Sequence, residues 1–176
     1  MDFHRVFIAV TPPPEARQAF AAYAAKAAAA YPGIRANDSP HITLIFLGFK
    51  NDEQVAAVRA SLATINAPKF TASLEGTGFF PDSRFPRVFW LGVKSPGLEE
   101  LRRTVATALS LPEEKFVPHA TIARIRDVRQ AQALKDSAQE NPFQPVSFEI
   151  TSFSLFESFL EKEGARHEEL AEYSLH

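Results

Sequence analysis

Hydrophobic positions along the chain follow two different periods, and these alternate from one segment to the next. Short apolar or alternating runs predict strands, because successive side chains of a strand point to opposite faces. Longer segments with apolar residues three or four apart predict helices. The predicted strands are Arg5–Val10, His41–Leu47, Phe70–Phe79, Arg87–Val93, Phe116–Ile125, Val146–Phe156 and Glu169–Leu175.

Four helices are predicted between these strands, from start and stop signals as well as from periodicity. Ser95 and Pro96 form one such start, a capping hydroxyl followed by a proline at the first helical position. The helices run from the prolines at 12–14 to about 30, from 51–52 through 62, from 95–96 through 109, and over 128–140. The remaining segments are expected to be the loops Ile34–Ser39 and Glu161–Arg166, the turn 81–83, and a strand end at Gly48.

This alternation of strands and helices predicts a single α/β domain over residues 1–176. One short motif occurs in each half of the chain, on a strand that a helix follows. We therefore expect two lobes related by a pseudo-two-fold axis, with the two motif strands meeting between them.

The repeated motifs are Pro40-His41-Ile42-Thr43-Leu44 and Pro118-His119-Ala120-Thr121-Ile122. Residues i and i+2 of a strand share one face. Each motif therefore places an imidazole beside a hydroxyl on one face and two aliphatic side chains on the other. Two facing motifs would form an anion site with acid–base capability.

A single His-x-Thr on a strand is usually structural, but two copies with the same flanking residues favour a function. The other histidines lie outside the motifs, and His4, His167 and His176 are expected to be surface residues. A metal site built on His41 and His119 would lack further ligands at short spacing. We therefore predict no catalytic metal and no cofactor.

Composition narrows the choice of function further. The formal net charge is −2, without the basic excess of a protein that coats long nucleic acid, although a local basic cluster could still grip one phosphate or an RNA end. The chain has no cysteine, which excludes disulfides and thiolate nucleophiles. The alanine-rich stretch at 19–30 is too short to span a bilayer. We expect a cytoplasmic monomer with no membrane contact.

Arginines follow the second motif, and Arg124 and Arg126 are candidates for holding a phosphate. Both have the wrong parity, however. In a regular strand they would point away from His119 and Thr121, and only a bulge, a strand end or a twisted rim would bring them back.

The paired motifs resemble those of the 2H phosphoesterases, in particular the RNA 2',3'-cyclic phosphodiesterases historically called 2'-5' RNA ligases. Further segments resemble this family's strands, namely Arg5–Val10, His41–Gly48 (HITLIFLG), Phe79–Pro81, Arg87–Val93 and Phe116–Arg124 (FVPHATIAR). The chain departs from the family pattern in having no tryptophan after Arg35 and in having His167 where a tyrosine is frequent.

The resemblance implies a bilobal α/β (α+β) fold of mostly antiparallel strands, with helices packed outside and a central cleft. It implies metal-independent opening of a 2',3'-cyclic phosphate at an RNA 3' end, or on a nucleoside, to a 2'-phosphomonoester. His41 would be the proton donor and His119 the acceptor, with Thr43, Thr121 and Arg124 on the phosphate.

Substrate contacts beyond the phosphate are expected from Phe7 and Arg126. Phe7, Phe46 and Phe49 could each stack on a base, although burial is the expected fate of such aromatic residues. Two alternatives stay open: a 2'-5' RNA ligase or phosphodiesterase, and an RNA-end binding module with little catalysis.

Overall fold

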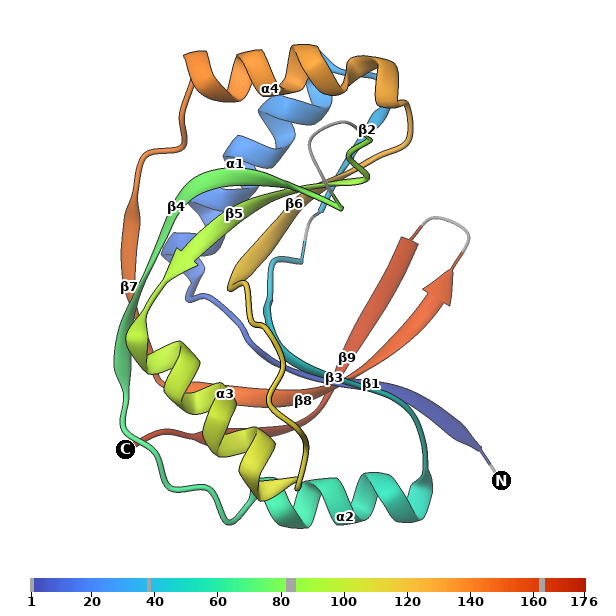
Figure 1. Cartoon of the computed structure of the whole chain (residues 1–176), viewed down its shortest axis with the longest axis vertical. Helices are drawn as coiled ribbons and strands as arrows, with labels where there is room; N and C mark the ends of the chain where they lie inside the picture. Colours follow the sequence, from blue (N-terminus) through green and yellow to red (C-terminus); the bar gives the residue numbers. More distant parts are fainter. Residues whose placement is uncertain (1, 38, 82–84, 162–163) are drawn as a thin grey trace.

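The computed structural model describes residues 2–37, 39–81, 85–161 and 164–176. A nine-stranded sheet dominates it, in the order β7-β4-β5-β6-β3-β1-β8-β9, with the short β2 paired to β6 (Figure 1). Every strand pair is antiparallel. The strands are β1 Phe3–Val10, β2 Ile34–Ala36, β3 Ile42–Asn51, β4 Phe70–Phe80, β5 Val88–Lys94, β6 His119–Ile125, β7 Val146–Ile150, β8 Ser152–Glu161 and β9 Gly164–Ser174.

The sheet divides into one group of β7, β4, β5 and β6, with β2 at its side, and a second group of β3, β1, β8 and β9, and the two motif strands meet where the groups join. β3 and β6 touch through a single ladder pair, Ile42 opposite Ala120. Apart from the short β2 and a 3-10 turn before α4, the element order β1-α1-β3-α2 recurs later in the chain as β5-α3-β6-α4. This repetition confirms the expected bilobal α/β fold. The groups are not the two halves of the chain, however, because β8 and β9 join the N-terminal strands. The boundaries of domains stay a prediction.

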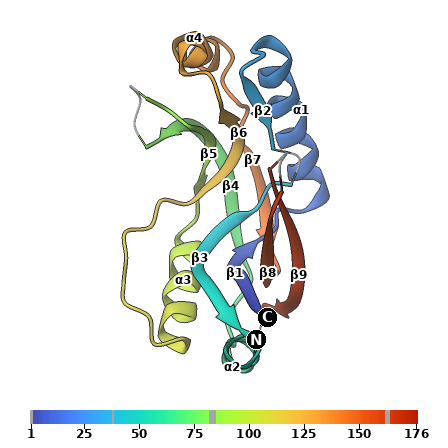
Figure 2. The same ribbon diagram turned by 90° about the vertical axis from the view of Figure 1, so that its right-hand side faces the viewer.

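Helices α1 (Pro14–Ala30) and α4 (Ala131–Glu140) lie at one end of the molecule, and α2 (Asp52–Leu62) and α3 (Pro96–Ala108) at the other (Figure 1). α1 packs on β2, β6 and β7, whereas α2 packs on β3 and β1 and α3 on β4 and β3. In the turned view, α1 and α3 lie on opposite sides of the sheet (Figure 2). None of the helices in the described segments is long and apolar enough to cross a membrane.

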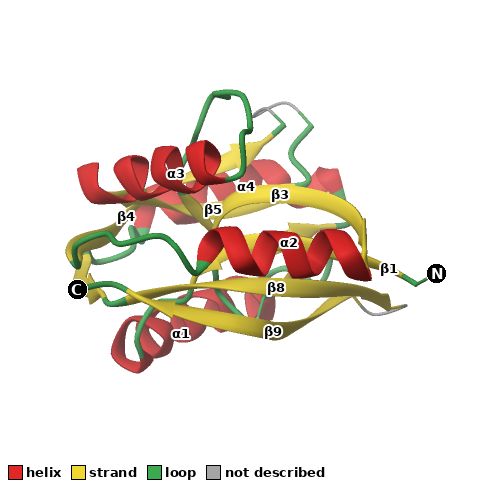
Figure 3. Cartoon of the chain, turned by 90° about the horizontal axis from the view of Figure 1, so that it is seen from below, coloured by secondary structure: helices red, strands yellow, loops and turns green. Residues whose placement is uncertain are grey.

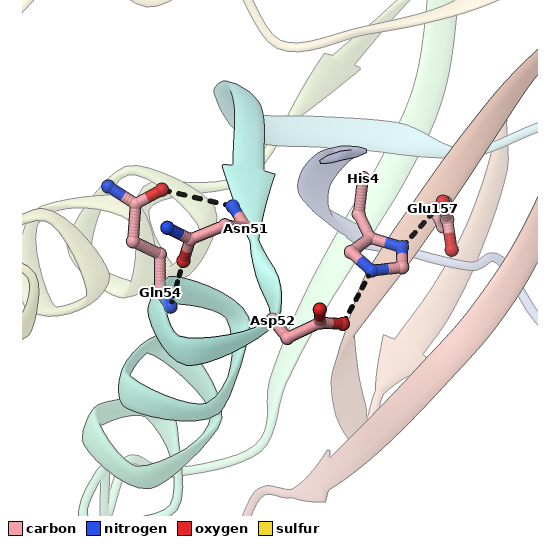
Figure 4. A network of polar contacts seen from close by, with 5 residues as sticks. All are labelled: His4, Asn51, Asp52, Gln54 and Glu157. Atoms are coloured by element: carbon pink, nitrogen blue, oxygen red, sulfur yellow. Dashed lines mark hydrogen bonds and ion pairs between the residues drawn. The ribbon is translucent and has the colours of Figure 1, made fainter. Parts of the chain in front are cut away.

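A polar network ties the outer end of β1 to its neighbours. His4 contacts Glu157 of β8 through Nδ1 at 2.9 Å and Asp52 of α2 through Nε2 at 3.0 Å (Figure 4). Beside it, Asn51 and Gln54 form a reciprocal capping box at the start of α2, which runs beside β1 and β3 (Figure 3). An imidazole that donates from both nitrogens is protonated, and the pKa of His4 is raised, first by the bond to Asp52 and then by the bond to Glu157.

Several predicted boundaries are wrong, each for a local reason. The expected loop at 34–39 contains β2, and β3 continues past Gly48 to Asn51 because Gly48 adopts a φ of 72° within a bulge. The predicted strand 146–156 is two strands divided at Thr151. Of the predicted loop 161–166, Glu161 ends β8 and Gly164–Arg166 begin β9, with Glu161 paired to Gly164, and residues 162–163 lie outside the described residues. Pro81 lies in a bend, and the rest of the turn predicted at 81–83 lies outside the described residues.

Two further corrections concern the third helix and the second motif strand. Ser95 occupies the N-cap position of α3, but its hydroxyl donates to the carbonyl of Thr71 at 2.8 Å rather than capping the helix. β6 begins at His119, whereas the prediction began at Phe116. The predicted helix at 128–140 opens with a 3-10 turn over Val128–Gln130 before α4.

Candidate active site

The two motif histidines are held in the same way, each by its own backbone. His41 Nδ1 lies 3.1 Å from the carbonyl oxygen of Ser39, and His119 Nδ1 lies 2.7 Å from that of Val117. A carbonyl can only accept, so both Nδ1 atoms carry the proton. In each neutral imidazole Nε2 is therefore the atom with the free lone pair. The site thus holds two histidines whose Nε2 atoms can take up or release a proton.

A β-bulge follows each motif at the same place. Thr121 pairs with Trp90 of β5, whereas Arg124, three residues further on, pairs with Val88, two residues from Trp90. β6 therefore carries one extra residue, and both Ile122 and Ala123 are fully buried. The bulge places the Arg124 side chain on the same face as His119 and Thr121, whereas in a regular strand it would point to the opposite face.

The first motif strand carries the matching bulge. Thr43 pairs with Ala9 of β1, and Phe46 pairs with Phe7, which is again two residues away. Phe46 thus shares a face with His41 and Thr43. It occupies the place in β3 that Arg124 occupies in β6. The two bulges make the site asymmetric, with a guanidinium beyond one threonine and an aromatic ring beyond the other.

Arg124 is one of several cations at its end of the site. It pairs in register with Arg35 of β2, so both side chains lie on the same face. Arg126 is exposed just past the end of β6, where its backbone N–H donates to the carbonyl of Gly33. Within the described residues, none of these three guanidiniums makes an ion pair. Anions approaching this end of the sheet meet uncompensated positive charge.

Aromatic rings surround His41. The ring of Phe7 lies 5.1 Å from the imidazole, and that of His167 lies 4.8 Å from it in a T-shaped contact. Phe7 is 1% exposed, so it supports the imidazole and leaves little surface for substrate. His167 lies in β9 and not on an outer loop, so its assignment to the surface is wrong. Its position could not be read from the sequence, because it depends on the β8–β9 register.

His119 is supported by a different pair of rings. Phe80 of β4 lies 4.9 Å from the imidazole in an edge contact, and Trp90 lies 5.9 Å from it. The indole covers Gly78, where a Cβ atom would lie 2.1 Å from a carbon of the Trp90 ring. Gly78 therefore leaves the space that lets Trp90 reach His119.

The electrostatics of the site act most strongly on His41. Burial lowers the pKa of His41 to about 4, and the positive charge of His167, His119 and Arg124 acts in the same direction. The hydrogen bond to Ser39 opposes this shift. The pKa of His167 is also lowered, first by burial and then by Arg5 and Arg124. In the free protein at neutral pH, His41 is therefore neutral.

The structure thus places His41, Thr43, His119 and Thr121 on one face, as strand parity predicts, and the bulge in β6 adds Arg124 to that face. It adds Phe80, Trp90 and His167, which sequence reasoning left out of the site. Within the described ranges, no group of three or more histidines, aspartates or glutamates is placed to hold a metal ion.

Comparison with known proteins agrees with this geometry. Residues 12–158 match the 2'-5' RNA ligase superfamily. An RNA 2',3'-cyclic phosphodiesterase of Aeropyrum pernix is 36% identical over 141 residues, which cover 75% of this chain and 80% of that protein. The protein of the same name from Thermotoga maritima is 30% identical over 142 residues, covering 77% and 75% of the two chains.

Solved structures show the same fold. LigT of E. coli superposes with a TM-score of 0.77 at 26% identity, over 99% of both chains. The protein TT0787 of Thermus thermophilus superposes with a TM-score of 0.76 at 27% identity, over 97% of both chains. LigT has also been crystallised in complex with 3'-AMP.

Proposed function

Since the chain belongs to the 2'-5' RNA ligase superfamily, we propose that it hydrolyses 2',3'-cyclic phosphates at RNA 3' ends to 2'-phosphomonoesters. The observation that carries this proposal is the matched pair His41 and His119. Both are fixed through Nδ1 to a carbonyl, and they stand on either side of the β3–β6 junction with a threonine beside each. Curated relatives with about a third of their residues identical bear the name of this activity.

The reaction requires a general base that accepts a proton from water and a general acid that donates a proton to the leaving oxygen. Nε2 of neutral His119 accepts a proton from water as the water oxygen bonds to phosphorus. The bond between phosphorus and the 3' oxygen breaks, and Nε2–H of protonated His41 supplies the proton to that oxygen. The product carries a 2'-phosphate and a free 3'-hydroxyl. An in-line displacement of this kind requires acid and base on opposite sides of the phosphate, which two strands related by a pseudo-two-fold axis favour.

The negative charge that develops on the non-bridging oxygens requires donors that are already in place. Thr43 and Thr121 supply hydroxyl groups on the same face as the imidazoles, and Arg124 supplies a guanidinium that the bulge in β6 turns toward them. These groups can neutralise the phosphate without a metal. We therefore propose that turnover continues in the presence of EDTA.

If His41 is the general acid, substrate binding has to favour its protonated form. With a pKa of about 4, His41 carries no proton at Nε2 in the free protein at neutral pH. A phosphate anion bound between the imidazoles would favour the protonated form, because an opposite charge within a few ångströms stabilises it. Substrate binding would thus bring His41 into its donor state.

Product analysis with adenosine 2',3'-cyclic phosphate in EDTA tests the proposal. The expected product is the 2'-phosphate alone. The 3'-phosphate as product would overturn the assignment of the leaving group. The superfamily's name also points to 2'-5' linkages, so a 2'-5' linked dinucleotide belongs in the same assay. Cleavage of that dinucleotide with the cyclic phosphate left intact would favour the alternative.

A further inference from the structure

An exposed row of aromatic side chains runs outward from His41 along β1 and β3. Phe46, Phe49 and Phe3 are 59%, 65% and 61% exposed. The burial expected for Phe46 and Phe49 from the sequence is therefore wrong. Such large apolar side chains gathered on one exposed face mark a binding surface more often than a single exposed residue does.

The ladder between β1 and β3 shows that these rings share the face of the active site. Phe46 pairs with Phe7, and the two ring centroids lie 5.4 Å apart. Phe49 pairs with Arg5, which has the same parity along β1 as Phe7 and Phe3. The row therefore begins at the ring that supports His41 and continues toward the N-terminal end of β1.

A cation stands within this row. The Arg5 guanidinium lies 5.5 Å from the centre of the Phe46 ring and donates a hydrogen bond to Ser158 at 3.0 Å. β1 and β3 are interior strands of the sheet, so the rings do not shield an open edge. Aromatic faces beside an arginine are the combination that binds single-stranded nucleic acid, with bases on the rings and the backbone near the cation.

We propose that Phe46, Phe49 and Phe3, with Arg5 between them, form a stacking platform for the bases that precede the cyclic phosphate of an RNA substrate. The platform rests on the proposed function, because it places the RNA end at His41 and His119. It makes the enzyme select an oligonucleotide over a mononucleotide. It requires no particular base, because each base has a face that can stack.

The test compares two substrates, adenosine 2',3'-cyclic phosphate and a short single-stranded RNA with the same end. Phe49 is the residue to change, because it pairs with Arg5 further along β1, whereas Phe46 contacts the ring of Phe7 that supports His41. Phe49→Leu keeps an apolar side chain and removes the aromatic face, whereas Phe49→Tyr keeps the face. Leu111→Ala, an exposed apolar truncation beyond α3, is the matched control.

With Phe49→Leu, kcat/KM for the RNA is expected to fall by roughly 5-fold or more, the cost of one lost base stack, and kcat/KM for the mononucleotide to stay unchanged. Phe49→Tyr and Leu111→Ala should behave as wild type on both. An unchanged value for the RNA, or an equal loss on both substrates, would overturn the platform.

A binding measurement separates this proposal from the proposed function. Fluorescence anisotropy with a 5'-labelled single-stranded RNA measures binding without turnover. It therefore tests the platform even if wild type hydrolyses neither substrate. Weaker binding by Phe49→Leu than by Phe49→Tyr supports the platform. Equal binding by the two variants overturns it.

Discussion

Arg124 and Thr121 lie on the same face of the sheet although they are three residues apart, because β6 holds an extra residue between them. Their partners on β5, Val88 and Trp90, are two residues apart. The bulge thus places on the face of His119 and Thr121 a side chain that a regular strand would point to the opposite face, where Arg124 is the proposed phosphate ligand.

The Arg124 guanidinium is therefore expected to matter for catalysis more than its neighbours. Arg124→Ala should lower kcat/KM for a 2',3'-cyclic phosphate by on the order of 10²-fold, the loss that follows removal of one transition-state donor. Arg124→Lys should recover only part of this, because an ammonium cannot replace a planar fork. Steady-state kinetics with Arg129→Ala as the control decides the matter, since Arg129 pairs with Asp127 on the surface. Equal effects of Arg124→Ala and Arg129→Ala would contradict this role.

The His41 imidazole should titrate far below its ordinary range. NMR titration of the free protein is expected to give a pKa of about 4 for His41. His167→Phe should raise this pKa, because it removes a neighbouring positive charge, but not to 6.5, because burial is the largest cause. Inorganic phosphate should raise it as well. A value near 6.5 in the free protein would contradict the description of the site.

Gly78 is expected to be intolerant of a side chain. Gly78→Ala would place a methyl group against the Trp90 ring and push the indole toward His119. Overpacking of this kind costs typically about 1–3 kcal/mol, so urea unfolding should show a loss of that size. Activity should fall as well, and Trp90→Leu in the same chain should recover stability by making room. Unchanged unfolding of Gly78→Ala would show that the ring is free to move aside.

The His4 network should make stability depend on pH. The pKa of His4 is raised in the folded protein. The contribution of His4 to the free energy of unfolding is therefore fully present below the unfolded value of 6.5 and is lost as pH rises through the folded pKa. His4→Gln should therefore lower the free energy of unfolding at about pH 6 and have little effect at about pH 9. Chemical unfolding at the two pH values measures this. A difference that does not shrink at high pH would show that His4 contributes by packing alone.

Much of the fold could be predicted from the sequence, because its signals are local. The four helices follow from capping residues, prolines and apolar spacing, and the capping box at Asn51 and Gln54 forms where the pattern places a helix start. The sequence does not predict boundaries that depend on a neighbouring strand, such as those of β2, which pairs with β6.

In the candidate site too, features set by neighbouring residues can be predicted from the sequence, whereas features set by pairing between distant strands cannot. His41 with Thr43, and His119 with Thr121, share a face by parity over two residues. The approach of His167 and the exposure of Phe46 depend on ladder registers between strands far apart in sequence. Arg124 falls between the two cases. Strand parity shows that Arg124 can share the face of His119 only if the strand is irregular, and the pairing between β5 and β6 shows where the bulge lies.

The most direct test of the central claim is ³¹P NMR of adenosine 2',3'-cyclic phosphate incubated with the protein in EDTA. Wild type should yield the 2'-phosphomonoester alone, and His41→Asn and His119→Asn should each yield almost none. Full turnover by His119→Asn, or the 3'-phosphomonoester as the product, would contradict the two-histidine mechanism.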